Sequence, residues 1–192
     1  MYSVVQKRNH KSKIINHKSM KRGLRNNNPL NIRHSADQWQ GARAEQTDKS
    51  FVQFETMEHG YRAAWKVLES YWKYFHRVRQ PFTVETIVGR WAPPGENDTR
   101  AYIRTVLMLT SLGGKENLPQ PSRGVDTGRL VKLLAAMTTM ECGMPYKEVD
   151  MEAIRKGYEM AFPGKRSYAR TQPVDVDEAM EDLLVWDEYR DW

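Results

Sequence analysis

Residues 127–143, TGRLVKLLAAMTTMECG, predict a helix whose apolar face is interrupted by one acid. Leu130, Leu134, Met137 and Glu141 are spaced so that they share one face of a helix. Gly143 is typical of the position just beyond a helix C-terminus, which places Glu141 in the last turn. The negative end of the helix dipole and the apolar neighbours both disfavour the anion, so we expect the pKa of the Glu141 carboxyl to be raised. A carboxylic acid that stays protonated can donate a proton to the leaving oxygen of a glycosidic bond. The alternative is that Glu141 lies in solvent at a frayed helix end.

The composition predicts one globular domain. The chain has 192 residues, of which 40% are hydrophobic, and this is enough for a core. No apolar run reaches the ~18 residues of a membrane span. The first residues, MYSVVQKRNHKSK, lack the apolar stretch of a secretory signal peptide. Cys142 is the single cysteine, so the chain cannot form an internal disulfide. We therefore expect synthesis in a reducing compartment and a separate delivery route to any substrate outside it.

The two ends of the chain carry opposite charge, although the net charge is +6. Residues 1–25 contain eight Lys or Arg residues and no acid, whereas residues 174–192 contain eight Asp or Glu residues and one Arg. We expect residues 1–21 to be a flexible basic arm, and residues 163–192 to be a linker followed by an acidic amphipathic helix. Either end can bind a partner protein. The arm has almost no aromatic residues for base stacking, which argues against a nucleic-acid partner.

The apolar spacing predicts a mainly α core over residues 22–162. Helices are expected over about 61–75, 84–91, 99–112, 127–142 and 150–162, with Thr99, Asp126 or Thr127, and Asp150 as caps for the last three. Gly113 and Gly114 are expected to end the third of these helices. Residues 39–54 predict a short β-hairpin with a turn at 47–50. Residues 22–33 and 115–125 are expected to be loops.

Between Arg22 and Phe162 the chain contains, in this order, the motifs RGLRNNNPLNIR, Trp39-Gln40-Gly41, EQTDKSFVQF, GYRA, RWAPPGENDTRAYI and ECGMPY. These motifs resemble a group of small phage and mobile-element proteins that look lysozyme-like and are often labelled virion structural proteins. They also resemble, in a shifted order, bacterial glucosaminidases and flagellar muramidases. Those enzymes begin with the helix that ends in the catalytic Glu, whereas here this helix comes last. The resemblance therefore implies a circularly permuted lysozyme-like domain.

The resemblance implies roles for several residues in glycosidic bond cleavage. Glu141 would be the general acid, and Tyr102 would orient or stabilise the reacting sugar. The second carboxylate would be the hairpin acid, Glu45 or Asp48. Glu96 is a further candidate from the sequence itself, because the prolines of its PPGEN loop could hold it in the cleft. A lytic transglycosylase would need no second carboxylate, because a hydroxyl of the sugar itself attacks. Each of these acids is also a candidate surface charge or helix cap, and Tyr102 is a candidate core residue.

Four further residues are candidates for binding the substrate. Asn31 and Asn97 could bind N-acetyl groups, although Asn in loops commonly stabilises turns. Trp39 and Trp91 could stack on sugar rings or pack in the core. We expect no cofactor, and the five His residues show no metal-ligand spacing.

A cysteine hydrolase using Cys142 with His34 or His59 is disfavoured. Nucleophilic thiols gain from helix N-termini, and Cys142 lies near a predicted helix C-terminus, where its pKa should be raised.

The sequence thus predicts an enzyme that cleaves the glycan strands of peptidoglycan as a muramidase, a glucosaminidase or a lytic transglycosylase. We expect it to be made in the bacterial cytoplasm and to be associated with a virion or delivered to the cell wall. The arm or the tail could contact virion or secretion-apparatus proteins. The alternative is a non-enzymatic virion structural or wall-binding module, which would not need a buried carboxylic acid.

Overall fold

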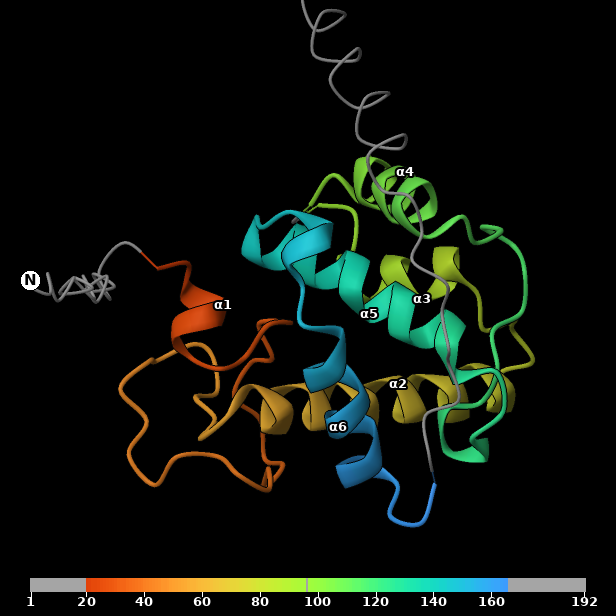
Figure 1. Cartoon of the computed structure of the whole chain (residues 1–192). Coiled ribbons are helices and arrows are strands. Elements are labelled where there is room, and N and C mark those ends of the chain that lie inside the picture. Colours follow the sequence, from red (N-terminus) through yellow and green to blue (C-terminus); the bar gives the residue numbers. More distant parts are fainter. Residues whose placement is uncertain (1–19, 96, 166–192) are drawn as a thin grey trace, which may run out of the picture.

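The computed structural model describes residues 20–95 and 97–165, and this part of the chain is mainly helical, as predicted (Figure 1). Its elements are α1 (Arg22–Arg25), α2 (Met57–Arg77), α3 (Val84–Trp91), α4 (Thr99–Thr110), the 3-10 turn η1 (Pro121–Arg123), α5 (Thr127–Cys142), the 3-10 turn η2 (Tyr146–Glu148) and α6 (Met151–Ala161). The basic arm, the acidic tail helix and Glu96 lie outside the described residues, so the expectations for them stay predictions.

The helix starts follow from short polar side chains. Thr56 precedes α2 and its hydroxyl accepts a hydrogen bond from the His59 backbone N–H. Asp150 caps α6 by accepting from the Ala153 N–H at 2.9 Å, as the sequence predicted. Each cap satisfies a backbone donor that the first helical turn leaves without a partner.

Helix α4 begins at Thr99, as the sequence predicted, but its predicted cap and its predicted end were wrong. Asp98, rather than Thr99, caps this helix by accepting from the Ala101 N–H at 2.9 Å. The Thr99 hydroxyl instead donates to the Ala92 carbonyl at 2.6 Å, so it is not available as a cap. The helix ends at Thr110, before the two glycines, because Ser111 already adopts the left-handed conformation with φ 54°.

Residues 39–54 do not form the predicted hairpin of two strands. The antiparallel pairing in this region is limited to isolated bridges, Arg33 with Phe51 and Ala42 with Phe54. The physical reason is that side chains take the backbone donors of the turn: Gln53 Oε1 accepts from the N–H groups of Thr47 and Asp48 at 2.6 and 3.0 Å. These N–H groups are therefore satisfied without a ladder of paired strands.

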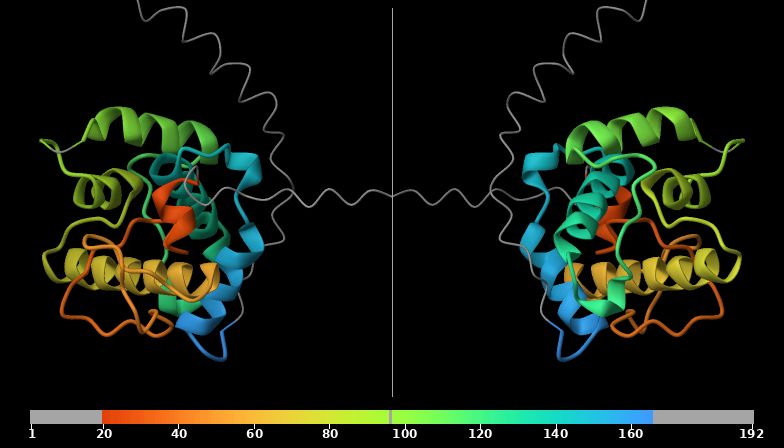
Figure 2. Two further views of the ribbon diagram at one scale, coloured as in Figure 1. Left: turned by 90° about the vertical axis from the view of Figure 1, so that its left-hand side faces the viewer. Right: turned by 90° about the vertical axis from the view of Figure 1, so that its right-hand side faces the viewer.

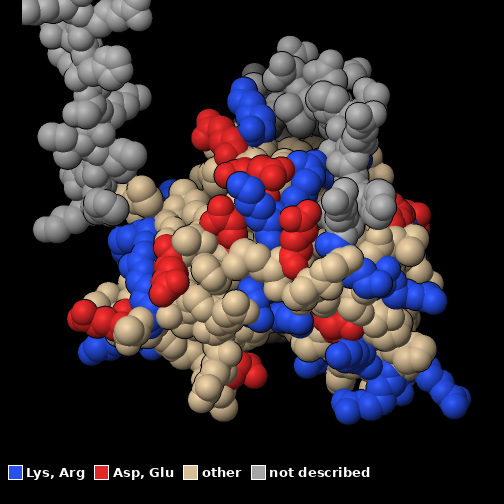
Figure 3. Space-filling model, turned by 60° about the horizontal axis from the view of Figure 1, so that its bottom comes forward, with Lys and Arg blue, Asp and Glu red and all other residues tan. Residues whose placement is uncertain are grey.

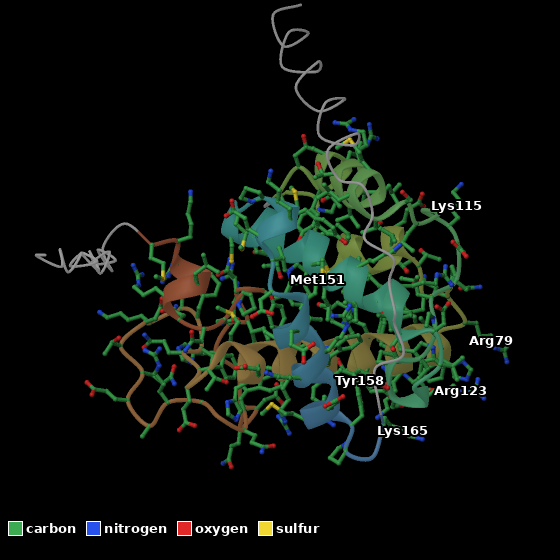
Figure 4. All side chains as sticks on the ribbon, in the orientation of Figure 1. Arg79, Lys115, Arg123, Met151, Tyr158 and Lys165 are labelled. Atoms are coloured by element: carbon green, nitrogen blue, oxygen red, sulfur yellow. The ribbon has the colours of Figure 1, made fainter. Side chains whose placement is uncertain are left out.

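Helix α5 lies at the centre of the fold. α2 runs beneath it, α3 and α4 lie on one side, and α6 crosses α2 on the other (Figures 1 and 2). Trp65 of α2 is fully buried and donates from Nε1 to the Ile154 carbonyl of α6 at 2.9 Å. The Tyr158 ring packs edge-on against Trp65 with centroids 4.9 Å apart, and its hydroxyl donates to the Pro121 carbonyl at 3.0 Å (Figure 4). Contacts of Trp65 and Tyr158 in the core thus connect α2, α6 and η1 directly.

The close packing of α6 on α2 depends on Gly157. A Cβ at this position would lie 2.7 Å from the Tyr61 Cβ and 2.9 Å from the Arg62 backbone N. Gly157→Ala is therefore expected to lower the free energy of unfolding by about 2 kcal/mol, because two helices must separate to admit it. Gly89→Ala in α3 is the matched control, since nothing lies within 4 Å of its added Cβ, and it should stabilise by about 0.5–1 kcal/mol. Urea denaturation of both variants checks this, and equal effects would contradict the packing argument.

Candidate active site

The structure places Glu141 in the last turn of α5, as predicted. Gly143 follows the helix in the left-handed conformation with φ 57°, and its N–H donates to the Thr139 carbonyl at 2.8 Å. The Glu141 side chain is only partly exposed. The frayed and fully solvated end that was the alternative is therefore not what this helix adopts.

Three side chains from three other segments hold the Glu141 carboxyl. Trp91 Nε1, from the end of α3, donates to Oε1 at 3.0 Å. The Tyr102 hydroxyl, from the first turn of α4, donates to the same oxygen at 3.1 Å. Asn31 Nδ2, from the loop after α1, donates to Oε2 at 3.0 Å. The carboxyl is thus fixed in orientation by residues that the sequence separates by 39 to 110 positions.

Tyr102 is brought to Glu141, as the sequence predicted. Its side chain is buried, and its hydroxyl also lies 3.4 Å from the Met137 carbonyl. Burial first, and the adjacent Glu141 charge second, raise the pKa of Tyr102 well above its ordinary value. The phenol therefore keeps its proton and acts as a hydrogen-bond donor.

Asn31 is positioned by an unusual backbone conformation. Its φ is 50°, in the left-handed region that Asn tolerates better than most residues. Its Nδ2 lies 3.3 Å from the Glu141 backbone carbonyl in addition to contacting the carboxyl. Its Oδ1 is buried and has no hydrogen-bond partner among the described residues. The amide nitrogen of Asn31 therefore donates to Glu141, whereas its amide oxygen remains available to accept a hydrogen bond.

The loop that carries Asn31 is fixed by its neighbouring asparagine. Asn28 Nδ2 donates to the carbonyls of Ile32 and Val52 at 2.9 and 2.8 Å, and Asn28 Oδ1 accepts from the Ile32 N–H at 2.8 Å. The Cys142 thiol donates to the Pro29 carbonyl at 3.3 Å. The loop therefore docks directly against the end of α5.

Asp48, one candidate for the second carboxylate, is held by side-chain and backbone donors of its own region of the chain. Its carboxylate accepts from Arg22 Nε and Nη2 at 2.7 and 2.6 Å, and from Asn26 Nδ2 at 2.7 Å. It also accepts from the backbone N–H groups of Ser50 and Phe51. The Arg22 hydrogen bond is the main cause of a pKa that lies well below the ordinary aspartate value. The partners Arg22 and Asn26 were not predicted from the sequence, although Asp before a bend is a common turn signal.

The remaining predicted site residues are not brought to Glu141 by any contact that the structure records. Glu45 and Asn97 are exposed on the surface. Trp39 packs against the core and is partly buried, and its Nε1 has no partner among residues 20–95 and 97–165. For Trp91 the sequence left open stacking on a sugar ring or packing in the core, and its hydrogen bond from Nε1 to Glu141 was not predicted. The sequence offered no signal that would separate these two uses of a tryptophan.

Cys142 is poorly suited to nucleophilic chemistry. Burial, with a smaller contribution from the Glu141 charge, raises the pKa of its thiol to about 12. The predicted direction is confirmed, but burial rather than the helix end is the larger cause. Among the described residues, no group of three or more His, Cys, Asp or Glu side chains is arranged to hold a metal ion.

Basic side chains are spread over the described surface. Lys and Arg lie among Asp and Glu on the face shown in Figure 3. Arg79, Lys115, Arg123 and Lys165 lie at the end of the molecule away from α1 (Figure 4). Because α1 packs against α5 near Glu141, these cations are remote from the candidate site. No helix within the described residues has the length and apolar character needed to span a membrane.

Comparison with known proteins adds the biological setting. No family model matches the chain. The chain is 36% identical over 148 residues to "Protein P5" of Pseudoalteromonas phage PM2, and this match covers 74% of the chain and 83% of that protein. The phage association that the sequence motifs implied is thereby supported. The chain belongs to the family of Protein P5 of phage PM2.

Proposed function

We propose that this protein cleaves the glycan strands of peptidoglycan, with Glu141 as the general acid, in a phage-associated setting. The observation that carries the proposal is the Glu141 carboxyl, held at a helix end by Asn31, Trp91 and Tyr102. Such a fixed, partly exposed carboxyl can be aimed at one substrate oxygen, which is what general acid catalysis requires.

The hydrogen bonds favour Oε2 as the oxygen that carries the catalytic proton. Oε1 already accepts from both Trp91 and Tyr102, whereas Asn31 is the single donor to Oε2 among residues 20–95 and 97–165. Oε2 therefore has a free direction in which a proton can point toward the glycosidic oxygen. After the transfer, the two donors at Oε1 stabilise the carboxylate that remains.

The two candidates for a second carboxylate that lie within the described residues favour a mechanism without one. The Asp48 carboxylate is used by Arg22, Asn26 and two backbone donors, and Glu45 lies exposed on the surface, while Glu96 lies outside the described residues. In a lytic transglycosylase, Glu141 protonates the leaving oxygen and the bond from the anomeric carbon to that oxygen breaks. A hydroxyl of the same sugar then attacks the anomeric carbon and returns its proton to Glu141. We propose this non-hydrolytic route.

The docking of the Asn31 loop on α5 supports a permuted lysozyme-like arrangement. In the enzymes that the motifs resemble, the Glu helix precedes the Asn loop. Here the loop precedes the helix by about a hundred residues, and yet Asn31 contacts Glu141 directly. Permutation preserves such contacts when the order of packed segments changes.

A non-enzymatic virion structural or wall-binding module is the second candidate. It is favoured by the same hydrogen bonds, because three donors around one carboxyl also tie four segments of the chain together. In that case Glu141 would matter for stability and not for any reaction.

The test is product analysis with purified bacterial peptidoglycan. We expect the full chain to release soluble fragments whose mass spectra show anhydro-muramic ends. Reducing ends would instead indicate hydrolysis by water and would contradict the non-hydrolytic route. Release of nothing from any bacterial wall, by protein that is folded by circular dichroism, would overturn the enzymatic proposal in favour of the structural module.

A further inference from the structure

A row of aromatic side chains leads from Glu141 to an arginine. The Trp91 ring, whose Nε1 contacts Glu141, packs edge-on against Tyr71 of α2 with centroids 6.2 Å apart. The Arg90 guanidinium carbon lies 5.0 Å from the Tyr71 ring centroid and 4.1 Å from that of Tyr74. The last turn of α3 thus carries both residues. Trp91 donates a hydrogen bond to Glu141, and Arg90, one residue earlier, packs its guanidinium against the rings of Tyr71 and Tyr74.

Arg90 carries a charge that the described part of the protein does not neutralise. It is exposed, and among residues 20–95 and 97–165 no carboxylate pairs with it. By contrast, Arg22 pairs with Asp48 at 2.6 Å and Arg129 pairs with Glu116 at 2.6 Å. An unpaired guanidinium that is already held by cation–π contacts loses little freedom on binding an anion.

The geometry suits recognition of a carboxylate. Arg90 has a side-chain hydrogen bond with Tyr71. A guanidinium has five N–H donors, and those that remain can match the two oxygens of a carboxylate. Peptidoglycan differs from neutral glycans of the same N-acetylated sugars because its peptide stems carry carboxylates. A cation one residue before the Trp91 that contacts the general acid can therefore distinguish a wall strand from a neutral strand such as chitin.

We propose that Arg90, held by Tyr71 and Tyr74, is a specificity-determining residue that binds a carboxylate of a peptide stem on the glycan strand bound at Glu141. This inference rests on the proposed function, since it names the substrate feature that the same site recognises. It assigns to Arg90 the role of selecting anionic strands, while Glu141 performs the chemistry.

The test compares wild type with Arg90→Gln on two forms of one substrate. Native sacculi carry free carboxylates, and carbodiimide treatment with an amine converts these to neutral amides. On native sacculi we expect Arg90→Gln to lower kcat/KM about tenfold, the usual size of a charged hydrogen bond. On amidated sacculi wild type and variant should be equal. If Arg90→Gln lowers kcat/KM equally on native and amidated sacculi, or lowers it on neither, the proposal is overturned.

A binding measurement separates this inference from the enzymatic proposal. Co-sedimentation with native and amidated sacculi is done in a Glu141→Gln background, so no turnover is needed. We expect Arg90→Gln to weaken binding to native sacculi only, with Arg90→Lys intermediate because it keeps the charge but loses the edge donors. Arg123→Gln is the matched control, since Arg123 is exposed at the far end of the molecule (Figure 4). Unchanged binding of the Arg90 variants to native sacculi would refute the inference even if wild type proves to be an active enzyme.

Discussion

Replacement of Glu141 by Gln is expected to reduce the release of fragments from purified peptidoglycan by at least ~100-fold. The amide keeps the shape of the side chain but has no acidic proton. Its Oε1 can still accept from Trp91 and Tyr102. Its Nε2 would face Asn31, whose Oδ1 has no partner among the described residues and can accept once the Asn31 side chain turns over. The melting temperature should therefore hold or rise, as is common when an active-site carboxylate is neutralised.

The control for this variant is Glu148→Gln. Glu148 is exposed on η2 and lies seven positions further along the chain. Both variants are assayed for release of soluble fragments and for thermal unfolding. A Glu141→Gln protein that keeps its activity would refute the role of general acid. A large fall in its melting temperature would instead favour the second candidate function, in which Glu141 stabilises the fold and takes part in no reaction.

Replacement of Asp48 by Asn is expected to lower the free energy of unfolding by about 2 kcal/mol. The Asp48 side chain is 6% exposed, and the new amide nitrogen would face donors of Arg22 or Asn26. The N–H groups of Ser50 and Phe51 would also lose a charged acceptor. Denaturant titration measures the loss. Activity per folded molecule should be unchanged, and a loss of activity in fully folded protein would restore Asp48 as the second carboxylate.

The same variant should remove a pH dependence of stability. The folded state lowers the pKa of Asp48, so the folded state binds fewer protons than the unfolded chain in acid. The stabilisation is fully present above the ordinary aspartate pKa of about 4 and is lost as the pH falls through the lower pKa of the folded state. The difference in unfolding free energy between wild type and Asp48→Asn should therefore shrink between about pH 6 and about pH 3. A constant difference across this range would contradict the assignment.

The helices and the central acid could be predicted because both depend on local spacing. The apolar face of Leu130, Leu134 and Met137, with Gly143 after it, was enough to place Glu141 in the last turn of α5. The bounds of α4 were less predictable. Asp98 and Thr99 are both good caps, and only the contact of Thr99 with Ala92 decides between them.

The partners of the acids could not be predicted to the same degree. Tyr102 and Asn31 were named from the order of the motifs, and the structure joins both to Glu141. Asp48 was named for the same reason, but Arg22, 26 positions earlier, holds it in a turn. Hydrophobic periodicity and composition predict which face of a helix or strand is buried. They do not predict which side chain, distant in the sequence, will be the partner in a hydrogen bond.

The contact between Asn31 and Glu141 has a consequence for how the protein folds. It joins residues 110 positions apart, so the closing of this long loop has to precede it. Contacts of such separation form slowly compared with helical turns. The individual helices can therefore arise early, whereas the carboxyl acquires its full set of donors only when the loop after α1 has met the end of α5. A chain in which α5 has formed and this loop has not yet docked lacks the Asn31 donor, so we expect competence for the proposed chemistry to follow the formation of this long-range contact.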